Sequence, residues 1–377
     1  MIDFDRLRRW PDVEAPELMA HDATDRLLLD TAEEALVAHP DDVVVIGDRY
    51  GALALGTADL VGDRPLRVHQ DSLSGELALA ANADRLDRPV TWSHHGLDAD
   101  LLAGARTVLL QLPRGLDALD EIAEQVAAHA HPDVRLVAGG RVKHMTTAMN
   151  DVLRRHFGEV TAGLARQKSR VLTATAPHPG AAYTWPKASR HGELVVVAHG
   201  AAFAGAAIDI GTRSLLTALD RVRTGPRPGG VDVVDLGCGT GVLAASYALA
   251  HPEARVVATD QSWAAVESAR ATTAASGVAD RVRVTRDDAG ASLPEASADL
   301  VLLNPPFHVG ATVHTGIAHK LFVAAARLLR PGGELWCVWN SPLGYRPGLE
   351  RTVGPTVQVS RDAKFTVTRS TRRAPTA

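Results

Sequence analysis

The sequence predicts an α/β fold of two tandem domains, each with a parallel sheet covered by helices on both faces. In residues 231–340, runs of β-branched residues alternate with stretches of helical length, and a glycine-rich turn joins the first run to the first helix. The first half of the chain repeats the same order of features. Strands that alternate with helices imply right-handed crossovers and a mainly parallel sheet.

The second half gives the clearer set of elements. It opens after the turn-rich segment RTGPRPGG with VDVVDLGCGTGVLAASYALA, a strand, a glycine turn and a helix. A second strand and helix follow, and the later helix is expected to end at a Pro-Gly-Gly sequence. The predicted segments are a strand and helix in 231–250, a strand and helix in 254–277, strands at 281–289 and 298–307, a helix at 317–333, a strand at 334–340 and a strand pair at 357–373.

The first half of the sequence resembles a degenerate copy of the second half. The matched positions are Gly47 with Gly237, Gly51 with Gly241, Arg49 with Gly239, Asp71 with Asp260, and Gln111-Leu112-Pro113 with Asn304-Pro305-Pro306. Arg49 and Tyr50 would fill the space that a cofactor needs, so this copy is expected to keep the fold and lack catalysis. We expect the first domain to span residues 1–178 and the second 184–377, with a linker around 175–186.

Composition limits the classes of function. The 377 residues are 46% hydrophobic, the formal net charge is −4, and no apolar run approaches the ~20 residues of a membrane span. With a charged N-terminus and only two cysteines, we expect a cytoplasmic, monomeric protein without a disulfide framework. His308, His314 and His319 lack a nearby cysteine or carboxylate cluster, so no metal site is expected.

The glycine turn and the acids after it predict a nucleotide-like cofactor. Gly237, Gly239 and Gly241 would let the backbone approach a ligand, while Asp260, at the end of the next strand, could accept both ribose hydroxyls. The spacing is G-x-G-x-G rather than the G-x-G-x-x-G of dinucleotide sites, which favours S-adenosylmethionine over NAD. The other candidate cofactor contacts are Asp235 at the turn, Asn304, and Asp287 or Asp288 near the adenine amino group, with Asp288 preferred.

A rigid polar loop follows the fourth strand, where Asn304, Pro305, Pro306 and Phe307 end a buried run. An exocyclic amine on a base has its lone pair delocalised into the ring, so two hydrogen-bond acceptors would help to hold it for attack on a methylsulfonium. The Asn304 side-chain oxygen and the Pro305 carbonyl could supply them, and Phe307 could stack on the base. These four residues are therefore the candidate catalytic set.

DLGCGTG, Asp260 and NPPF together resemble class I methyltransferases that modify amino groups, and NPPF followed by His308 is similar to their ribosomal RNA guanine-N2 branch. The segment 203–216, with Asp209, Gly211 and Thr212, also resembles that branch, although Gly205 stands where its members often have arginine. The resemblance implies two Rossmann-like methyltransferase domains, a degenerate first one, S-adenosylmethionine as cofactor and ribosomal RNA as substrate. The first half is more similar to the large-subunit enzyme, which implies 23S RNA.

A local excess of basic residues indicates how the first half could bind RNA. Residues 141–191 hold nine Lys and Arg residues against two acids, which could contact phosphates in an otherwise acidic protein. The alternative is a scattered, solvated surface. The four residues chosen as candidate RNA contacts are Arg141, Lys143, Arg166 and Lys168.

Two other functions compete with guanine-N2 methylation of ribosomal RNA, in which 23S RNA is the favoured substrate and 16S RNA the alternative. One is methylation of adenine N6 or of a protein glutamine, since both activities use related Asn-Pro-Pro loops. The other is a non-catalytic ribosome assembly factor that binds the cofactor, which the intact Asn304-Pro305-Pro306-Phe307 disfavours.

Overall fold

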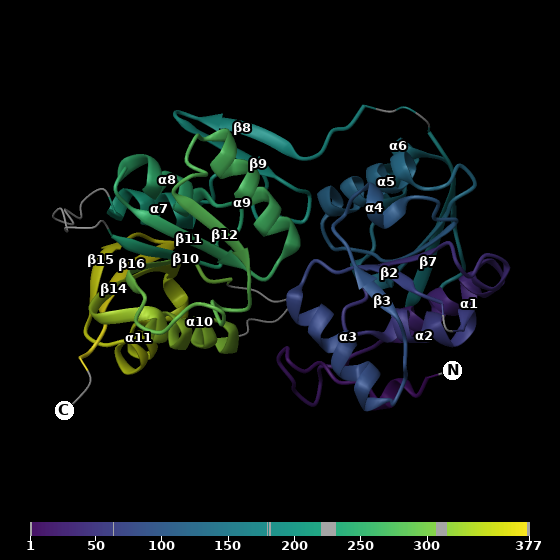
Figure 1. Cartoon of the computed structure of the whole chain (residues 1–377), viewed down its shortest axis with the longest axis horizontal. Coiled ribbons are helices and arrows are strands. Elements are labelled where there is room, and N and C mark those ends of the chain that lie inside the picture. Colours follow the sequence, from purple (N-terminus) through teal and green to yellow (C-terminus); the bar gives the residue numbers. More distant parts are fainter. Residues whose placement is uncertain are drawn as a thin grey trace. The chain divides into compact units, whose positions relative to one another are not determined.

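The computed structural model describes residues 2–62, 64–178, 180, 182–219, 231–306 and 315–374. The chain divides after Trp185 into two compact units, each with a seven-stranded mixed sheet (Figure 1). The predicted α/β class with two tandem domains is confirmed. None of the helices in the described ranges has the length and apolar character needed to cross a bilayer.

The first unit begins with a polar-capped helix and then alternates strands and helices. The Asp22 carboxylate caps the first helix, and the fully buried run Val43–Ile46 is typical of a central parallel strand. Its elements are η1 (Phe4–Arg6), α1 (Ala23–Ala38), β1 (Val43–Ile46), α2 (Ala52–Val61), β2 (Leu66–His69), α3 (Leu73–Arg85), β3 (Trp92–His94), α4 (Ala99–Leu102), β4 (Thr107–Gln111), α5 (Leu116–His129), β5 (Arg135–Arg141), η2 (Val142–His144), α6 (Thr147–His156), β6 (Phe157–Ala162) and β7 (Ser169–Pro177).

The second unit repeats this order after an additional hairpin. Its elements are β8 (Lys187–His191), β9 (Leu194–Ala198), α7 (Ile210–Leu219), β10 (Asp232–Leu236), α8 (Val242–Ala250), β11 (Arg255–Asp260), α9 (Trp263–Ala275), β12 (Val282–Arg286), β13 (Ala298–Leu303), α10 (Thr315–Leu328), β14 (Leu329–Asn340), η3 (Ser341–Leu343), α11 (Arg346–Thr352), β15 (Thr356–Arg361) and β16 (Phe365–Thr371).

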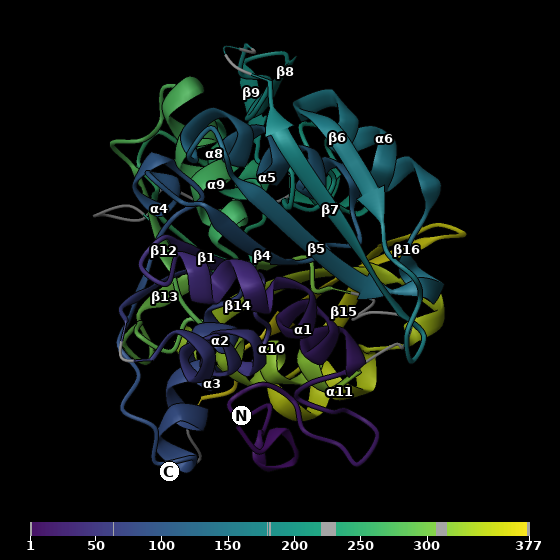
Figure 2. The ribbon, with the colours of Figure 1, turned by 90° about the vertical axis from the view of Figure 1, so that its right-hand side faces the viewer.

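Helices cover both faces of each sheet. Figures 1 and 2 show α1, α2 and α3 on one side of the first sheet and α4, α5 and α6 on the other. In the second unit α7, α8 and α9 contact one another in series, as do α10 and α11. Buried aliphatic side chains of the central strands fill the space beneath these helices, so the polar groups of interest lie at the strand ends.

The two sheets have equivalent strand orders, which supports an internal duplication. The first runs β3-β2-β1-β4-β5-β7-β6, and the second runs β12-β11-β10-β13-β14-β16-β15. In β1 and β4, Val43 pairs with Thr107, whereas in β10 and β13 Val233 pairs with Leu300. Counting along each ladder places Gln111 at the position of Asn304, as the sequence predicted.

The ladder corrects one predicted pair. The equivalent hydrogen bonds run from Gly47 N to His69 O (3.0 Å) and from Gly237 N to Thr259 O (2.8 Å). The residue that follows β2 at the position of Asp260 is therefore Gln70, and the match of Asp71 with Asp260 was wrong by one residue. The first domain has lost the acid at this strand end.

The helix before β14 ends earlier than predicted. α10 stops at Leu328, and β14 already begins at Leu329, which pairs with Ala298. Pro331 disfavours helical geometry for Arg330, and Gly332 has a φ of 79°. The Pro-Gly-Gly sequence therefore lies within the start of the strand and makes a local irregularity there.

The β8–β9 hairpin is held by hydroxyl groups of α9. Three backbone N–H groups of this hairpin and the residue after it donate to side chains spaced four residues apart on the helix. The bonds are Val195 N to Ser276 Oγ (3.0 Å), Val197 N to Thr272 Oγ1 (2.9 Å) and His199 N to Ser268 Oγ (2.9 Å). This ladder satisfies donors of an edge strand that would otherwise lack a partner strand.

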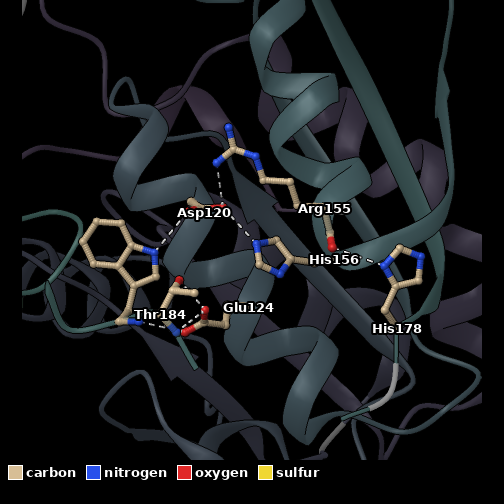
Figure 3. Close-up of polar contacts among 7 residues, drawn as sticks. Asp120, Glu124, Arg155, His156, His178 and Thr184 are labelled. Atoms are coloured by element: carbon tan, nitrogen blue, oxygen red, sulfur yellow. Dashed lines mark hydrogen bonds and ion pairs between the residues drawn. The ribbon is translucent and has the colours of Figure 1, made fainter. Parts of the chain in front are cut away.

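The end of the first unit is anchored on α5 and α6 (Figure 3). Glu124 accepts hydrogen bonds from Thr184 N (2.8 Å) and Thr184 Oγ1 (2.6 Å), and Asp120 accepts one from Trp185 Nε1 (3.2 Å). Although burial acts to raise it, the pKa of Asp120 is lowered by hydrogen bonds from His156 and Trp185. The chain is therefore fixed to the first unit as far as Trp185.

Candidate active site

A glycine-rich turn, residues 237–241, lies at the carboxyl end of β10, and we call it the glycine cradle. Gly237, Gly239 and Gly241 have φ values of 75°, 53° and 76°, a region that favours glycine. A Cβ on Gly241 would lie 2.9 Å from Ala269 Cβ, so this glycine lets α8 approach α9. A Cβ on Gly237 or Gly239 would meet no described atom within 4 Å, which leaves the backbone there open to a ligand.

Asp260 braces the cradle from the end of β11. Its Oδ2 accepts a hydrogen bond from Gly239 N (3.0 Å), and its Oδ1 accepts one from Ser262 N (3.0 Å). A carboxylate only accepts hydrogen bonds, and its two oxygens lie side by side. Two adjacent hydroxyl groups, such as those of a ribose, match that arrangement.

Asp235 lies beneath the same turn and is fully buried. Its Oδ2 accepts a hydrogen bond from Ala244 N (3.0 Å), whereas its buried Oδ1 has no partner among the described residues. Burial raises the pKa of Asp235 to about 7, the Ala244 N–H acts against this, and the charge of Asp260 adds to it. A buried polar atom without a partner among the described residues calls for an explanation, and a donor from a bound ligand is one.

The two acids after β12 have separate partners. The Asp287 carboxylate accepts hydrogen bonds from Ser292 N (2.9 Å) and Ser292 Oγ (2.7 Å), as a turn cap would. Asp288 is paired with Lys320 of α10, whose Nζ lies 2.7 Å from its Oδ1. Asp287 N also donates to the carbonyl of Asp260 (2.9 Å), which places this turn beside the cradle.

Asn304 follows β13 and joins two parts of the second unit. Its Nδ2 donates to Thr212 Oγ1 (3.0 Å) and Asp209 Oδ2 (3.3 Å) at the start of α7. Its Oδ1 is buried and has no partner among the described residues. Pro305 is buried and Pro306 exposed, while the predicted Phe307 and His308 lie outside the described residues. An acceptor is thus available beside a rigid loop at the same sheet edge as the cradle.

The corresponding edge of the first unit has a different chemistry. Tyr50 is buried, and its hydroxyl donates to Asp12 (2.6 Å), whereas Arg49 is exposed, so only Tyr50 occupies the interior as predicted. The Gln70 amide donates to the Asp48 carbonyl. The Asp48 carboxylate accepts from the backbone of the following helix, with Ala54 N at 2.7 Å. The first unit therefore fills this edge with polar side chains that bond to one another and to its own backbone.

Three of the four predicted RNA contacts gather at the carboxyl edge of the first sheet. Arg141 ends β5, Lys143 lies in η2, and Lys168 O accepts a hydrogen bond from Val142 N (2.9 Å). Arg166, the fourth, forms an ion pair with Asp30, so its charge is already balanced.

Two further cations at this edge were not predicted. Burial lowers the pKa of His144, and so do the positive charges of Arg114, Lys143, Arg49 and Arg141, which therefore lie near enough to act on it. Arg49 follows β1 and Arg114 follows β4. Single basic residues in turns give no sequence signal, and only the fold brings them beside the predicted set.

Comparisons with known proteins match a separate family profile to each of the two units. The family profile of the Methyltransferase small domain matches residues 193–369, and that of the RLMG N-terminal domain matches residues 3–178. Ribosomal RNA large subunit methyltransferase G of Streptomyces coelicolor is 36% identical over 384 residues, which cover 97% of each chain. The protein of the same name from Pseudomonas paraeruginosa is 35% identical over 375 residues, covering 96% of each.

A solved structure has the same fold. It is a 16S rRNA N2 G1207 methyltransferase of T. thermophilus in complex with AdoMet and guanosine, and it matches with a TM-score of 0.73 and 23% identity. The match covers 94% of this chain and 92% of that one. The likeness extends over both units and supports their description as tandem domains of one architecture.

Proposed function

This chain belongs to the ribosomal RNA large subunit methyltransferase G family, and from that membership we propose that it methylates the exocyclic N2 amine of a guanine in 23S ribosomal RNA. S-adenosylmethionine is the proposed methyl donor. The observation that carries the proposal is the Oδ1 of Asn304, which is buried beside Pro305 at the sheet edge of the glycine turn and has no partner in the part of the chain that the structure describes. We expect the enzyme to act as a monomer in the cytoplasm.

The residues of the second domain fit the cofactor. Gly237 and Gly239 leave space beside their backbone, and the Asp260 carboxylate at the end of β11 is placed to accept hydrogen bonds from the ribose hydroxyls. Asp235 offers a buried acceptor that has no partner among the described residues. Asp288 is proposed for the adenine side, where its pairing with Lys320 leaves room for a further hydrogen bond. When bound, S-adenosylmethionine supplies an electrophilic methyl group on its sulfonium.

Asn304 and Pro305 would hold the target amine. The Asn304 Oδ1 and the Pro305 carbonyl can each accept one N–H of an exocyclic amine, which fixes the nitrogen in front of the methyl group. Pro305 and Pro306 restrict the loop backbone, so the two acceptors keep their spacing. Because bound S-adenosylmethionine would supply a neutral thioether as the leaving group, the amine could lose its proton after transfer. Asn304 and Pro305 would then need to act only as acceptors, with no separate strong base.

The first domain is proposed to bind the RNA. It has buried Tyr50 and Gln70 where the second domain has its glycine turn and Asp260, and it carries cations along the same edge. Guanidinium and ammonium groups bind phosphates without reading sequence, so this surface would position the RNA while the second domain selects the base. A protein glutamine as the target would leave this basic edge without a purpose, whereas an adenine in RNA would use it equally.

The proposed activity can be tested on isolated ribosomal RNA. Purified protein should transfer labelled methyl groups to 23S RNA from a strain that lacks the enzyme, and nuclease digestion with mass spectrometry should identify N2-methylguanosine. 16S RNA serves as the matched substrate control. Label in N6-methyladenosine, or in ribosomal protein instead of RNA, would contradict the proposed target.

Asp260→Ala should weaken binding of S-adenosylmethionine by about 1.5–3 kcal/mol, the range for hydrogen bonds to a charged group. The carboxylate is expected to accept the ribose hydroxyls while it braces Gly239. Calorimetry measures the affinity, and Asp280→Ala, which removes an exposed acid beside Arg281, is the matched control. Equal affinities for the two variants would remove Asp260 from the cofactor site.

A further inference from the structure

The amide of Asn304 can work only in one orientation. In one orientation the amide presents its oxygen, which can accept a hydrogen bond from the target amine. In the other orientation it presents its NH2 group, and two hydrogen-bond donors would then face each other. Something must therefore select the first orientation. The two neighbours of the Nδ2 group, Asp209 and Thr212, are in the right place to do this.

Their chemistry fixes which end of the amide they face. Asp209 Oδ2 lies 3.3 Å from Asn304 Nδ2, and Thr212 Oγ1 lies 3.0 Å from it. A carboxylate only accepts hydrogen bonds, so the end of the amide that faces it must be the NH2 group. The Asn304 Oδ1 then points away from α7, where it is buried and has no partner among the described residues.

Asp209 is itself held firmly. Its Oδ2 accepts hydrogen bonds from Gly211 N (2.9 Å) and Thr212 N (3.2 Å), the free N–H groups at the start of α7. Gly211 allows this approach, because a Cβ there would lie 3.0 Å from the same oxygen and 3.1 Å from Phe365 Cε1. The carboxylate therefore has little freedom to follow a rotating amide.

We propose that Asp209 and Thr212 are positioning residues, which hold the Asn304 amide with its oxygen towards the target amine. The proposal rests on the proposed role of Asn304. The first domain keeps a similar contact between the Gln111 amide and Asp25, so the contact also ties a helix to the sheet. A test must therefore separate the rate of transfer from stability.

Two pairs of variants make that separation. Asp209→Ala should lower kcat about ten- to 100-fold, and Thr212→Val about three- to tenfold, the ranges for a charged and a neutral hydrogen bond. Asp209→Asn should recover most of the loss, because all three bonds converge on one oxygen, which an amide carbonyl can replace. Thr212→Ser, which keeps the hydroxyl, should do the same.

KM for RNA and the affinity for S-adenosylmethionine should stay within about twofold of wild type in all four variants, because the two residues act through Asn304. Thr212→Val keeps the cap on α7, so it decides the question if Asp209→Ala fails to fold. A wild-type kcat for Thr212→Val, or equal losses in Thr212→Val and Thr212→Ser, would overturn the positioning role. Normal turnover of Asn304→Ala would instead overturn the proposed role of Asn304, on which this proposal rests.

Discussion

Asn304→Ala is expected to lower the rate of methyl transfer about 100- to 1,000-fold, the range for loss of one preorganised hydrogen-bonding group. The affinity for S-adenosylmethionine should change only a few-fold, because the side chain is proposed to contact the amine. The physical reason is the loss of the buried Oδ1 acceptor at the end of β13. Single-turnover kinetics with 23S RNA would measure the rate, and calorimetry the affinity.

The duplicated fold offers a matched control for this variant. Gln111→Ala removes the amide at the equivalent position of the first sheet, which donates to Asp25 as Asn304 donates to Asp209. Both variants break a contact between an amide and an aspartate, so they share any loss of stability from that source. Only Asn304→Ala should lose methyl transfer, and similar rates for the two variants would contradict the catalytic role.

Features close together in the sequence were predictable. The glycine turn, Asp260 and Asn304 lie at the carboxyl ends of β10, β11 and β13, because β-branched runs and turn residues mark strand ends locally. In a parallel sheet these ends share one edge, so the neighbourhood of the three features follows from the topology. Their roles towards cofactor and amine stay predictions.

Register and long-range contacts were harder to predict. Asp71 was matched to Asp260 because both are acids, whereas the ladder places Gln70 there. The spacing from the glycine turn, taken alone, gives Gln70 as the equivalent of Asp260. The preference for an acidic residue shifted the match to Asp71, because the acid at this strand end is absent from the first domain. The contact of Asn304 with Asp209 joins residues 95 positions apart, and nothing local to either residue indicates it.

The basic edge of the first sheet shows the same limit. Arg141, Lys143 and Lys168 lie in one basic stretch of sequence and were predicted together. Arg49 and Arg114 each follow a different strand and join them only because β1, β4 and β5 end at one edge. Arg166 belongs to the same stretch, yet the fold pairs it with Asp30. Clustering of basic residues in the sequence therefore predicts only part of the basic surface that the fold forms.

Reversing three charges at this edge, with Arg141→Glu, Lys143→Glu and Lys168→Glu, should weaken binding to 23S RNA about 100-fold or more at moderate salt. For every phosphate that is no longer bound, the slope of log K against log salt should fall by about 0.7–1. Affinity for S-adenosylmethionine should be unchanged, because the cradle lies in the other domain. Filter binding across a salt series measures the first two quantities.

A second triple reversal separates docking from net charge. Arg64, Arg88 and Arg135 are exposed and lie just before β2, before β3 and at the start of β5, at the opposite edge of the same sheet. Changing them to glutamate shifts the formal charge equally, so a purely long-range effect of charge would weaken RNA binding in both triples. Phosphate contacts at the carboxyl edge predict a large loss only for the first triple. Equal losses would leave the basic edge without a specific role, because a surface that docks RNA must act through where its charges lie.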